Sequence, residues 1–159
     1  MPQSPPHLAS SAILERGGHY LLVKRANPPS ADMYAFPGGR AEAGETPEET
    51  AVREFFEETA IAPRNARLFQ TYDLPAQQAD GPGARHFFLS VFKVEADVDP
   101  IAVAGDDAAE IGWFSADEIY RLPIPDSVRD CVEKLEALRR SGAPETALPD
   151  QPIREPKSE

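Results

Sequence analysis

Three glutamates, Glu54, Glu57 and Glu58, occupy positions i, i+3 and i+4 of a segment whose sequence predicts a helix. At about 100° per residue, their side chains fall within an arc of roughly 80 to 100°. Like charges at this spacing repel by roughly a few tenths of a kcal/mol per pair, and Arg53 is the cation close enough in sequence to offset them. A divalent cation such as Mg²⁺ would turn this repulsion into a binding site, because it binds carboxylate and phosphate oxygens together. The alternative interpretation is a solvated helix face.

The segment that positions these glutamates has a well-marked start. Thr46 occupies the N-cap, Pro47 the first helical position, and Glu49 completes a Thr-x-x-Glu capping box. Residues 38–45 (GGRAEAGE) precede the helix and read as a glycine-punctuated turn, and the helix is expected to run to Ile61. Four further positions share a separate arc and are expected to face a core: Val52, Phe55, Phe56 and Thr59.

The spacing of the charged residues resembles the Nudix box, the signature of the Nudix hydrolases. The family pattern is Gly, five residues, Glu, seven residues, Arg-Glu, a bulky apolar residue, any residue, Glu-Glu, any residue, Gly and a final apolar residue. This chain has Gly39, Glu45 and residues 53–61 (REFFEETAI) at the matching positions. Ala60 stands where the family has Gly, which puts the local backbone in question, and Phe55 stands where an aliphatic residue is commoner.

The resemblance implies a role for each matching position. Residues 34–39 (YAFPGG) resemble the aromatic-x-aromatic-Pro-Gly-Gly lead-in of this family, which implies that the Gly38 carbonyl is a metal ligand. Arg53 would orient the glutamates by hydrogen bonds and ion pairs. Glu45, with Gly39, would support the loop and helix geometry or bind the metal through water. The implied cofactor is Mg²⁺, with Mn²⁺ as the alternative ion. The implied metal ligands are Gly38, Glu54, Glu57 and Glu58.

These residue types suit pyrophosphate hydrolysis. Phosphoryl and nucleotidyl transfer place charge on non-bridging oxygens, so positioning and electrostatic neutralisation dominate the barrier. A nearby carboxylate would take a proton from the attacking water. In the family this base is a box glutamate or a carboxylate of a later loop, where Glu110 is the first candidate and Asp106 and Asp107 follow. The alternative for Glu110 is a solvated acid in an acidic loop. The expected catalytic residues are Arg53, Glu54, Glu57, Glu58 and Glu110.

The substrate that the resemblance implies is ADP-ribose or a similar ADP-sugar, cleaved to AMP and a sugar phosphate. Pro75 lies 15 positions after Ala60, close to where the ADP-ribose pyrophosphatase subgroup carries a proline, although prolines commonly begin loops. Residues 104–110 (AGDDAAE), followed by Trp113 and Phe114, also resemble compact members of that subgroup. Residues expected to contact the substrate, with core packing as the alternative for the aromatic ones, are Tyr34, Phe36, Tyr72, Pro75 and Arg85.

Other functions stay open at this point. A nucleoside triphosphate with an oxidised base is the main rival substrate. A Nudix-like module that binds a nucleotide without cleaving it is a second class, although such a module has no need of three adjacent metal carboxylates. A plain α/β scaffold is a third. The histidines, His7, His19 and His86, show no spacing typical of a zinc site, and the chain has no Gly-x-x-x-x-Gly-Lys loop or Gly-x-Ser-x-Gly elbow.

Composition bounds the class of protein. A length of 159 residues fits one domain with a sizeable core. The formal net charge of −11 argues against a nucleic-acid polymer as partner, but allows a small nucleotide if a metal supplies local positive charge. Cys131 is the single cysteine, so no intramolecular disulfide forms, and with no signal peptide recognised we expect a cytoplasmic protein. No stretch approaches the roughly 18 apolar residues of a membrane span, and a homodimer is left open.

Strands interleaved with one central and two C-terminal helices predict an α/β fold, with helices on both sides of a mixed β-sheet. The Nudix resemblance implies the same three-layer α/β/α sandwich. A single domain is expected over residues 8–140, and a disordered tail over residues 141–159. The helices are expected to have Thr46, Ser115 and Asp126 as N-caps. Strands are expected at residues 7–15, 20–25, 67–74, 85–96 and 111–114.

Overall fold

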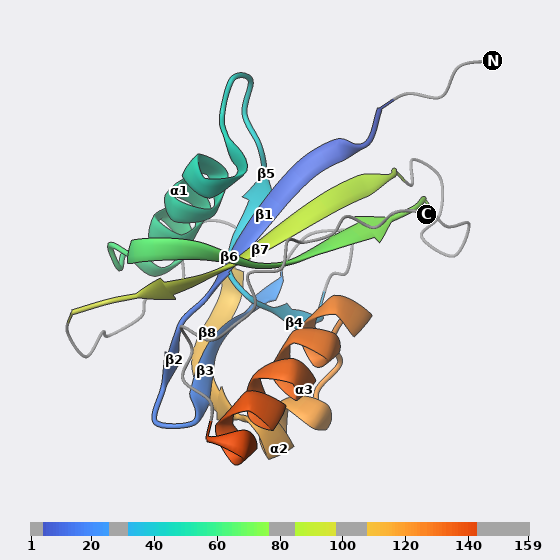
Figure 1. The fold of residues 1–159 in the computed structure, drawn as a ribbon. Helices are drawn as coiled ribbons and strands as arrows, with labels where there is room; N and C mark the ends of the chain where they lie inside the picture. Colours follow the sequence, from blue (N-terminus) through green and yellow to red (C-terminus); the bar gives the residue numbers. More distant parts are fainter. Residues whose placement is uncertain (1–4, 26–31, 77–84, 98–107, 143–159) are drawn as a thin grey trace.

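The computed structural model describes residues 5–25, 32–76, 85–97 and 108–142. Within these ranges one helix stands between two groups of strands, and two helices follow the second group, as the sequence predicts (Figure 1). The elements are β1 (His7–Ile13), β2 (Glu15–Arg16), β3 (His19–Arg25), β4 (Tyr34–Ala35), β5 (Gly38–Arg40), α1 (Pro47–Thr59), β6 (Arg64–Leu74), β7 (Phe87–Glu95), β8 (Ala108–Ser115), α2 (Ala116–Tyr120) and α3 (Asp126–Ser141).

The strands form two sheets. The first has the order β5-β1-β7-β6 and is mixed, because β1 runs parallel to β7 while β5 and β6 run antiparallel to their neighbours. In the second sheet, β3 pairs antiparallel with β2, β4 and β8. The expected mixed sheet is therefore present, and the remaining strands form a second, antiparallel sheet.

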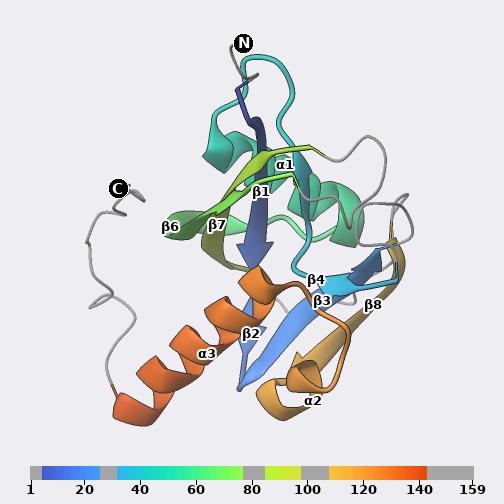
Figure 2. The same ribbon diagram turned by 90° about the vertical axis from the view of Figure 1, so that its right-hand side faces the viewer.

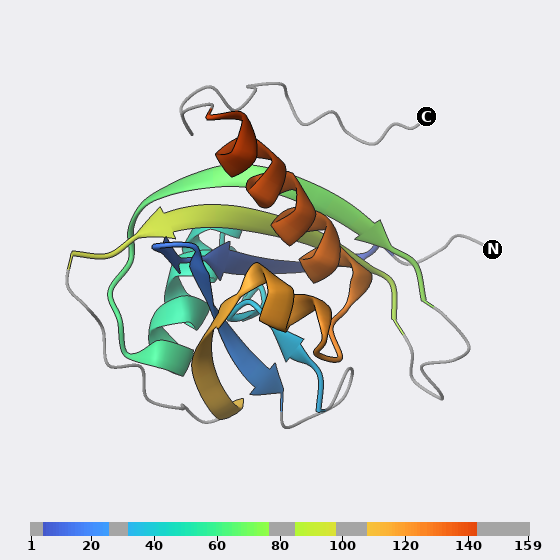
Figure 3. The same cartoon turned by 90° about the horizontal axis from the view of Figure 1, so that it is seen from below.

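Helices cover both faces of the mixed sheet (Figures 1 and 2). On one face, Phe55 of α1 belongs to a core cluster with Ala12 and Phe92. On the other face, α3 lies across the strands (Figure 3), and Val132 belongs to a second cluster with Val91. Because successive strand residues point to opposite faces, Val91 and Phe92 serve different cores. The expected helix–sheet–helix layering is confirmed.

The buried face of α1 differs from the sequence expectation. Phe55 is fully buried and marks the inward direction. At about 100° per residue, Glu58 lies roughly 60° from Phe55, whereas Glu54 and Phe56 lie roughly 100° away on opposite sides. Accordingly, Glu58 is only 5% exposed and Phe56 is 51% exposed. The expectation that Phe56 faces the core is wrong, and the glutamate stripe is tilted toward the interior.

The local signals at the helix starts are confirmed for two of three helices. Thr46 and Ser115 both form complete capping boxes with the glutamate three residues later. The expectation of Asp126 as an N-cap is wrong, because Pro125 occupies the cap of α3 and no side chain bonds to the free amides there. Residues 38–40, expected within a turn, pair with β1 as strand β5.

Some expectations fall outside the described residues. Asp106 and Asp107 lie there, and so do residues 143–159 of the expected tail. Ser141 is the last residue of α3, and the proposed domain limits, residues 8 to 140, stay a prediction. Within the described ranges, no helix combines the length and the apolar character needed to cross a membrane.

Ala60 ends α1 in a left-handed backbone conformation, with φ at 62°. This region costs an L-residue roughly 1–2 kcal/mol, whereas glycine enters it freely but loses more chain entropy on folding. We therefore expect Ala60→Gly to raise the free energy of unfolding by roughly 0.5–1 kcal/mol in urea denaturation.

The matched control for this substitution is Ala62→Gly. Ala62 is exposed, lies just after α1 and has no positive φ, so glycine there is expected to leave stability unchanged or to lower it. Equal changes in both variants would contradict a strained helix end.

Candidate active site

The Arg53 guanidinium lies at the centre of an ion-pair network. Its Nε donates a hydrogen bond to Glu45 at 2.6 Å. Its Nη1 donates to Glu54 at 3.0 Å and to Glu57 at 3.2 Å, and its Nη2 donates to the Arg40 carbonyl at 3.0 Å. The hydrogen bond to Glu45 is the main cause that raises the pKa of Arg53. One permanent cation therefore offsets part of the repulsion along α1.

Glu45 ties the loop before α1 to the helix. Besides its bonds from Arg53, the Glu45 carboxylate accepts hydrogen bonds from the Glu42 amide at 2.9 Å and from the Thr50 hydroxyl at 2.8 Å. These bonds, that of Arg53 foremost, lower the pKa of Glu45 to about 2. Because its oxygens already have protein donors, this geometry favours the supporting role for Glu45 over the water-mediated metal role.

Gly39 allows the backbone of β5 to approach the helix carboxylates, and Gly38 allows it to approach Ser10 and Ser11 of β1. The Gly38 amide donates a hydrogen bond to Oε1 of Glu58 at 3.3 Å. A Cβ atom on Gly39 would lie 2.5 Å from Cδ of Glu54, so any side chain there would displace that carboxyl group. Neither glycine has a positive φ. Close approach, rather than turn geometry, therefore explains the Gly-Gly pair.

Glu54 and Glu58 share a hydrogen bond, which requires a proton on one of the two carboxyl groups. Burial is the main cause that raises the pKa of each, and the adjacent Glu54 charge adds to it for Glu58, whose pKa rises to about 8. The Glu57 side chain is 54% exposed. The site thus contains two inward carboxyl groups in contact and a third at their rim.

This donor set fits a hard divalent cation by its chemistry. Among the described residues, no three carboxylate, histidine or cysteine side chains are grouped so that they could hold a metal ion. Arg53 engages Glu54 and Glu57, and a proton links Glu54 to Glu58. A cation would replace that proton and remove the repulsion between the two carboxylates. Glu54 and Glu58 are therefore the pair best placed to hold it, and Glu57 would join through a rotamer change.

A cleft of about 280 Å³ opens against the two glycines that contact these glutamates, and no described glutamate lines it. Its lining includes Pro125, Ser127 and Val128 at the start of α3. Gly38 and Gly39 form part of its wall, as does Arg25 at the end of β3. The Arg25 charge also opposes the rise in the pKa of Glu58. Sequence reasoning missed Arg25, because a basic residue ending a strand carries no distinguishing signal. Apolar residues line much of the remaining wall, among them Phe36, Leu74, Phe87, Leu89 and Val91.

Glu110, the expected general base, lies on β8 opposite Lys24 of β3. It accepts a hydrogen bond from the Tyr34 hydroxyl at 3.1 Å, and the Tyr34 ring packs edge-on against Phe114. In the part of the chain that the structure describes, the hydrogen bond found for Glu110 is to Tyr34 and not to a glutamate of α1. Its role as a base and that of Tyr34 in substrate binding stay predictions.

The other expected substrate contacts lie at different depths. Phe36 lines the cleft and is 5% exposed. The Tyr72 hydroxyl donates a hydrogen bond to Asp130 of α3 at 2.6 Å. The Tyr72 side chain is therefore directed toward α3. Pro75 and Arg85 are exposed and lie just beyond the last paired residues of β6 and β7, which line the cleft. These substrate contacts also stay predictions.

Comparisons of the sequence relate the chain to known proteins. Residues 5–135 match the family model described as NUDIX domain. Over 117 residues the chain is 36% identical to the ADP-ribose pyrophosphatase of Methanocaldococcus jannaschii, covering 74% of this chain and 66% of that protein. It is 29% identical over 124 residues to the NAD-capped RNA hydrolase NudC of Pectobacterium carotovorum, covering 77% of this chain and 45% of that protein. The chain thus spans slightly less than two thirds of the first relative and under half of the second.

The fold comparison agrees with the sequence comparison. The crystal structure of a MutT NUDIX hydrolase from Burkholderia pseudomallei superposes with a TM-score of 0.71 at 29% identity, covering 83% of this chain and 99% of that chain. The three-layer α/β/α sandwich expected from the sequence is therefore confirmed.

The raised pKa of Glu58 predicts how stability varies with pH in EDTA. The folded protein holds a proton on Glu58 up to about pH 8, whereas the unfolded chain releases it near pH 4.5. The free energy of unfolding should therefore fall as the pH rises through that interval. In Glu58→Gln this contribution is absent, so its decline in urea denaturation should be shallower than that of the wild type.

Glu48→Gln is the matched control for that pH series. Glu48 is exposed in the first turn of the same helix, so its variant should follow the wild-type pH dependence. If Glu58→Gln and wild type declined equally, the buried protonated carboxyl group would be refuted.

Proposed function

Because the chain belongs to the NUDIX domain family, we propose that it is a Mg²⁺-dependent pyrophosphohydrolase that cleaves ADP-ribose or a similar ADP-sugar to AMP and a sugar phosphate. One observation carries this proposal. The carboxyl groups of Glu54 and Glu58 lie inward against Gly38 and Gly39, and the same two glycines form part of the wall of an open cleft. A diphosphate bound at the glycine edge of that cleft would lie near these two carboxyl groups, and a cation between them would make the approach favourable.

Each residue would contribute through its charge and position. A bound divalent cation would neutralise charge on the non-bridging phosphate oxygens and increase the acidity of the attacking water. Arg53 would fix Glu54 and Glu57 through the two bonds of its Nη1 atom. Arg25 would form a charge-assisted hydrogen bond with a phosphate oxygen in the cleft. Glu110, or else a box glutamate, would accept the proton of the water.

Two observations support an ADP-sugar as the substrate. The relative with 36% identity is an ADP-ribose pyrophosphatase, and this chain spans 66% of its length. The cleft joins apolar walls, which suit a nucleoside ring, to two arginines, Arg25 and Arg40, which suit a diphosphate. Phe36 offers the aromatic surface in that wall.

Rival functions follow from the same site. A nucleoside triphosphate could present its phosphates to the same carboxylates. The similarity to NAD-capped RNA hydrolases suggests an RNA substrate as a further alternative. A net charge of −11 on the chain is unfavourable for binding a polymer of phosphates. A binding module without catalysis would leave the intact set of Glu54, Glu57 and Glu58 without a purpose. The expected cytoplasmic location and a homodimer stay predictions.

Glu57→Gln tests the proposed metal-dependent chemistry. Loss of one metal ligand should lower kcat/KM for ADP-ribose on the order of 100-fold or more, while the far-UV circular dichroism stays unchanged. The partly exposed position of Glu57 makes the substitution structurally mild. Glu48→Gln, an exposed glutamate of the same helix, should keep wild-type activity. Comparable turnover by wild type and Glu57→Gln would refute the assigned role.

A substrate panel tests the proposed substrate. Purified protein is incubated with Mg²⁺ and, separately, ADP-ribose, ADP-glucose, nucleoside triphosphates and NAD-capped RNA, and the products are separated by chromatography. We expect AMP and ribose 5-phosphate from ADP-ribose at the highest kcat/KM. Preferred release of pyrophosphate from a triphosphate would refute the proposed substrate but not the proposed metal-dependent hydrolysis. Tight binding without any product would refute the proposal that the protein is an enzyme.

A further inference from the structure

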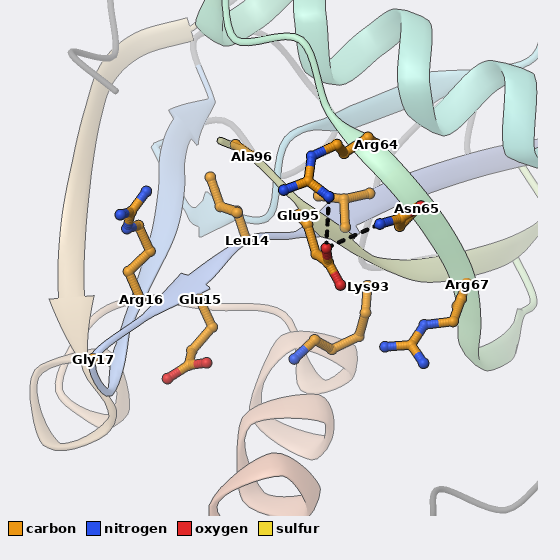
Figure 4. Close-up of a pocket in the computed structure, with 11 residues that line it drawn as sticks. Leu14, Glu15, Arg16, Gly17, Arg64, Asn65, Arg67, Lys93, Glu95 and Ala96 are labelled. Carbon is orange, nitrogen blue, oxygen red and sulfur yellow. Dashed lines mark hydrogen bonds and ion pairs between the residues drawn. The ribbon is translucent and has the colours of Figure 1, made fainter. Parts of the chain in front are cut away.

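A second cleft, of about 390 Å³, opens farther along the strands of the mixed sheet (Figure 4). The proposed substrate cleft reaches Leu89 and Val91 on β7, whereas the second begins at Lys93 of the same strand. Between them, α3 packs on the sheet through the cluster that contains Val91 and Val132. No described residue lines both clefts, so the second is a separate feature of the surface.

The charge of this second cleft is opposite to that of the whole chain. Four cationic and two anionic side chains line it, which gives a local charge of +2 in a chain whose net charge is −11. An excess of positive charge in a concave surface attracts small anions. The charged lining residues are Arg16, Arg64, Arg67, Lys93, Glu15 and Glu95.

The two carboxylates of the cleft are held by neighbouring protein groups. Glu95 accepts hydrogen bonds from Arg64 at 2.9 Å and from the Asn65 amide at 3.0 Å. Glu15 accepts a hydrogen bond from the Gly18 amide at 2.8 Å. These bonds fix the carboxylates at the wall and leave the space of the cleft between them.

Two cations converge on that space. Arg67 of β6 and Lys93 of β7 are directly paired across the two strands, and both side chains extend toward the region below Glu95 in Figure 4. Arg67 is exposed and Lys93 is only 7% exposed. Because the effective dielectric falls with burial, an anion beside Lys93 would be attracted more strongly than one at an open surface.

We propose that this basic cleft binds a phosphate dianion between Arg67 and Lys93, either as inorganic phosphate or as the terminal group of a small phosphorylated molecule. A phosphate monoester carries a charge of about −1.5 to −2 at neutral pH, which matches the local charge of the cleft. Its oxygens can accept from the guanidinium and the ammonium group together. The inference does not rest on the proposed enzymatic function.

The test is a ¹⁵N-¹H shift titration of the full chain with inorganic phosphate and, separately, with ribose 5-phosphate, at constant ionic strength in EDTA. We expect saturable shifts centred on residues 14–17, 64–67 and 93–96, and the tighter of the two probes identifies the source of the phosphate. Arg67→Gln should weaken binding about tenfold, the loss expected for one charge-assisted hydrogen bond. Arg121→Gln, an exposed arginine outside both clefts, is the matched control.

Three outcomes would overturn the proposal. They are shifts that do not saturate, shifts centred on residues 38–39 and α1 instead, and equal affinities of Arg67→Gln and Arg121→Gln. Because Arg67 is exposed, its variant is expected to fold, and unchanged distant cross-peaks confirm that. Lys93→Gln provides a second test and should also weaken binding about tenfold.

Discussion

The crowding of carboxylates along α1 is the constraint on which the rest of the site depends. Three glutamates within one and a half helical turns would repel one another, and the fold meets this in two ways. Arg53 binds Glu54 and Glu57, and a shared proton links Glu54 to Glu58. The shared proton can be released, and a divalent cation can then bind in its place. The helix is thus arranged to favour metal binding.

The neighbouring glycines belong to the same arrangement. Gly38 supplies an amide to Glu58, and Gly39 leaves the space that the Glu54 carboxyl group fills. Residues 38–40 form a strand paired with β1, so this close approach is fixed by sheet hydrogen bonds instead of a mobile turn. Loop, strand and helix therefore hold the carboxylates together, and residues 38–40 of that strand also line the cleft.

The sequence predicted much of this because short-range chemistry determines it. Capping boxes at Thr46 and Ser115 involve residues three apart, and both formed as expected. What it did not predict depends on tertiary contacts. The exposure of Phe56 and the burial of Glu58 depend on how α1 is rotated about its axis. The helical spacing of the residues does not determine that rotation.

Residues that reach the site from distant elements also could not be predicted from local sequence. Arg25 reaches the cleft from the end of β3, and no local pattern marks it. The second sheet, which carries Glu110, is built from strand pairings between β3 and β8 that lie far apart in the chain. A stretch of sequence can predict that such strands exist, but their partners follow from the packing of the whole fold.

Mg²⁺ binding measured by isothermal titration calorimetry at pH 7, in two buffers with different ionisation enthalpies, tests the central claim most directly. If a cation replaces the proton shared by Glu54 and Glu58, the observed enthalpy will differ between the buffers by an amount corresponding to about one proton released. Glu58→Gln should release clearly fewer. Identical enthalpies in both buffers, or no binding of Mg²⁺ at all, would contradict the account.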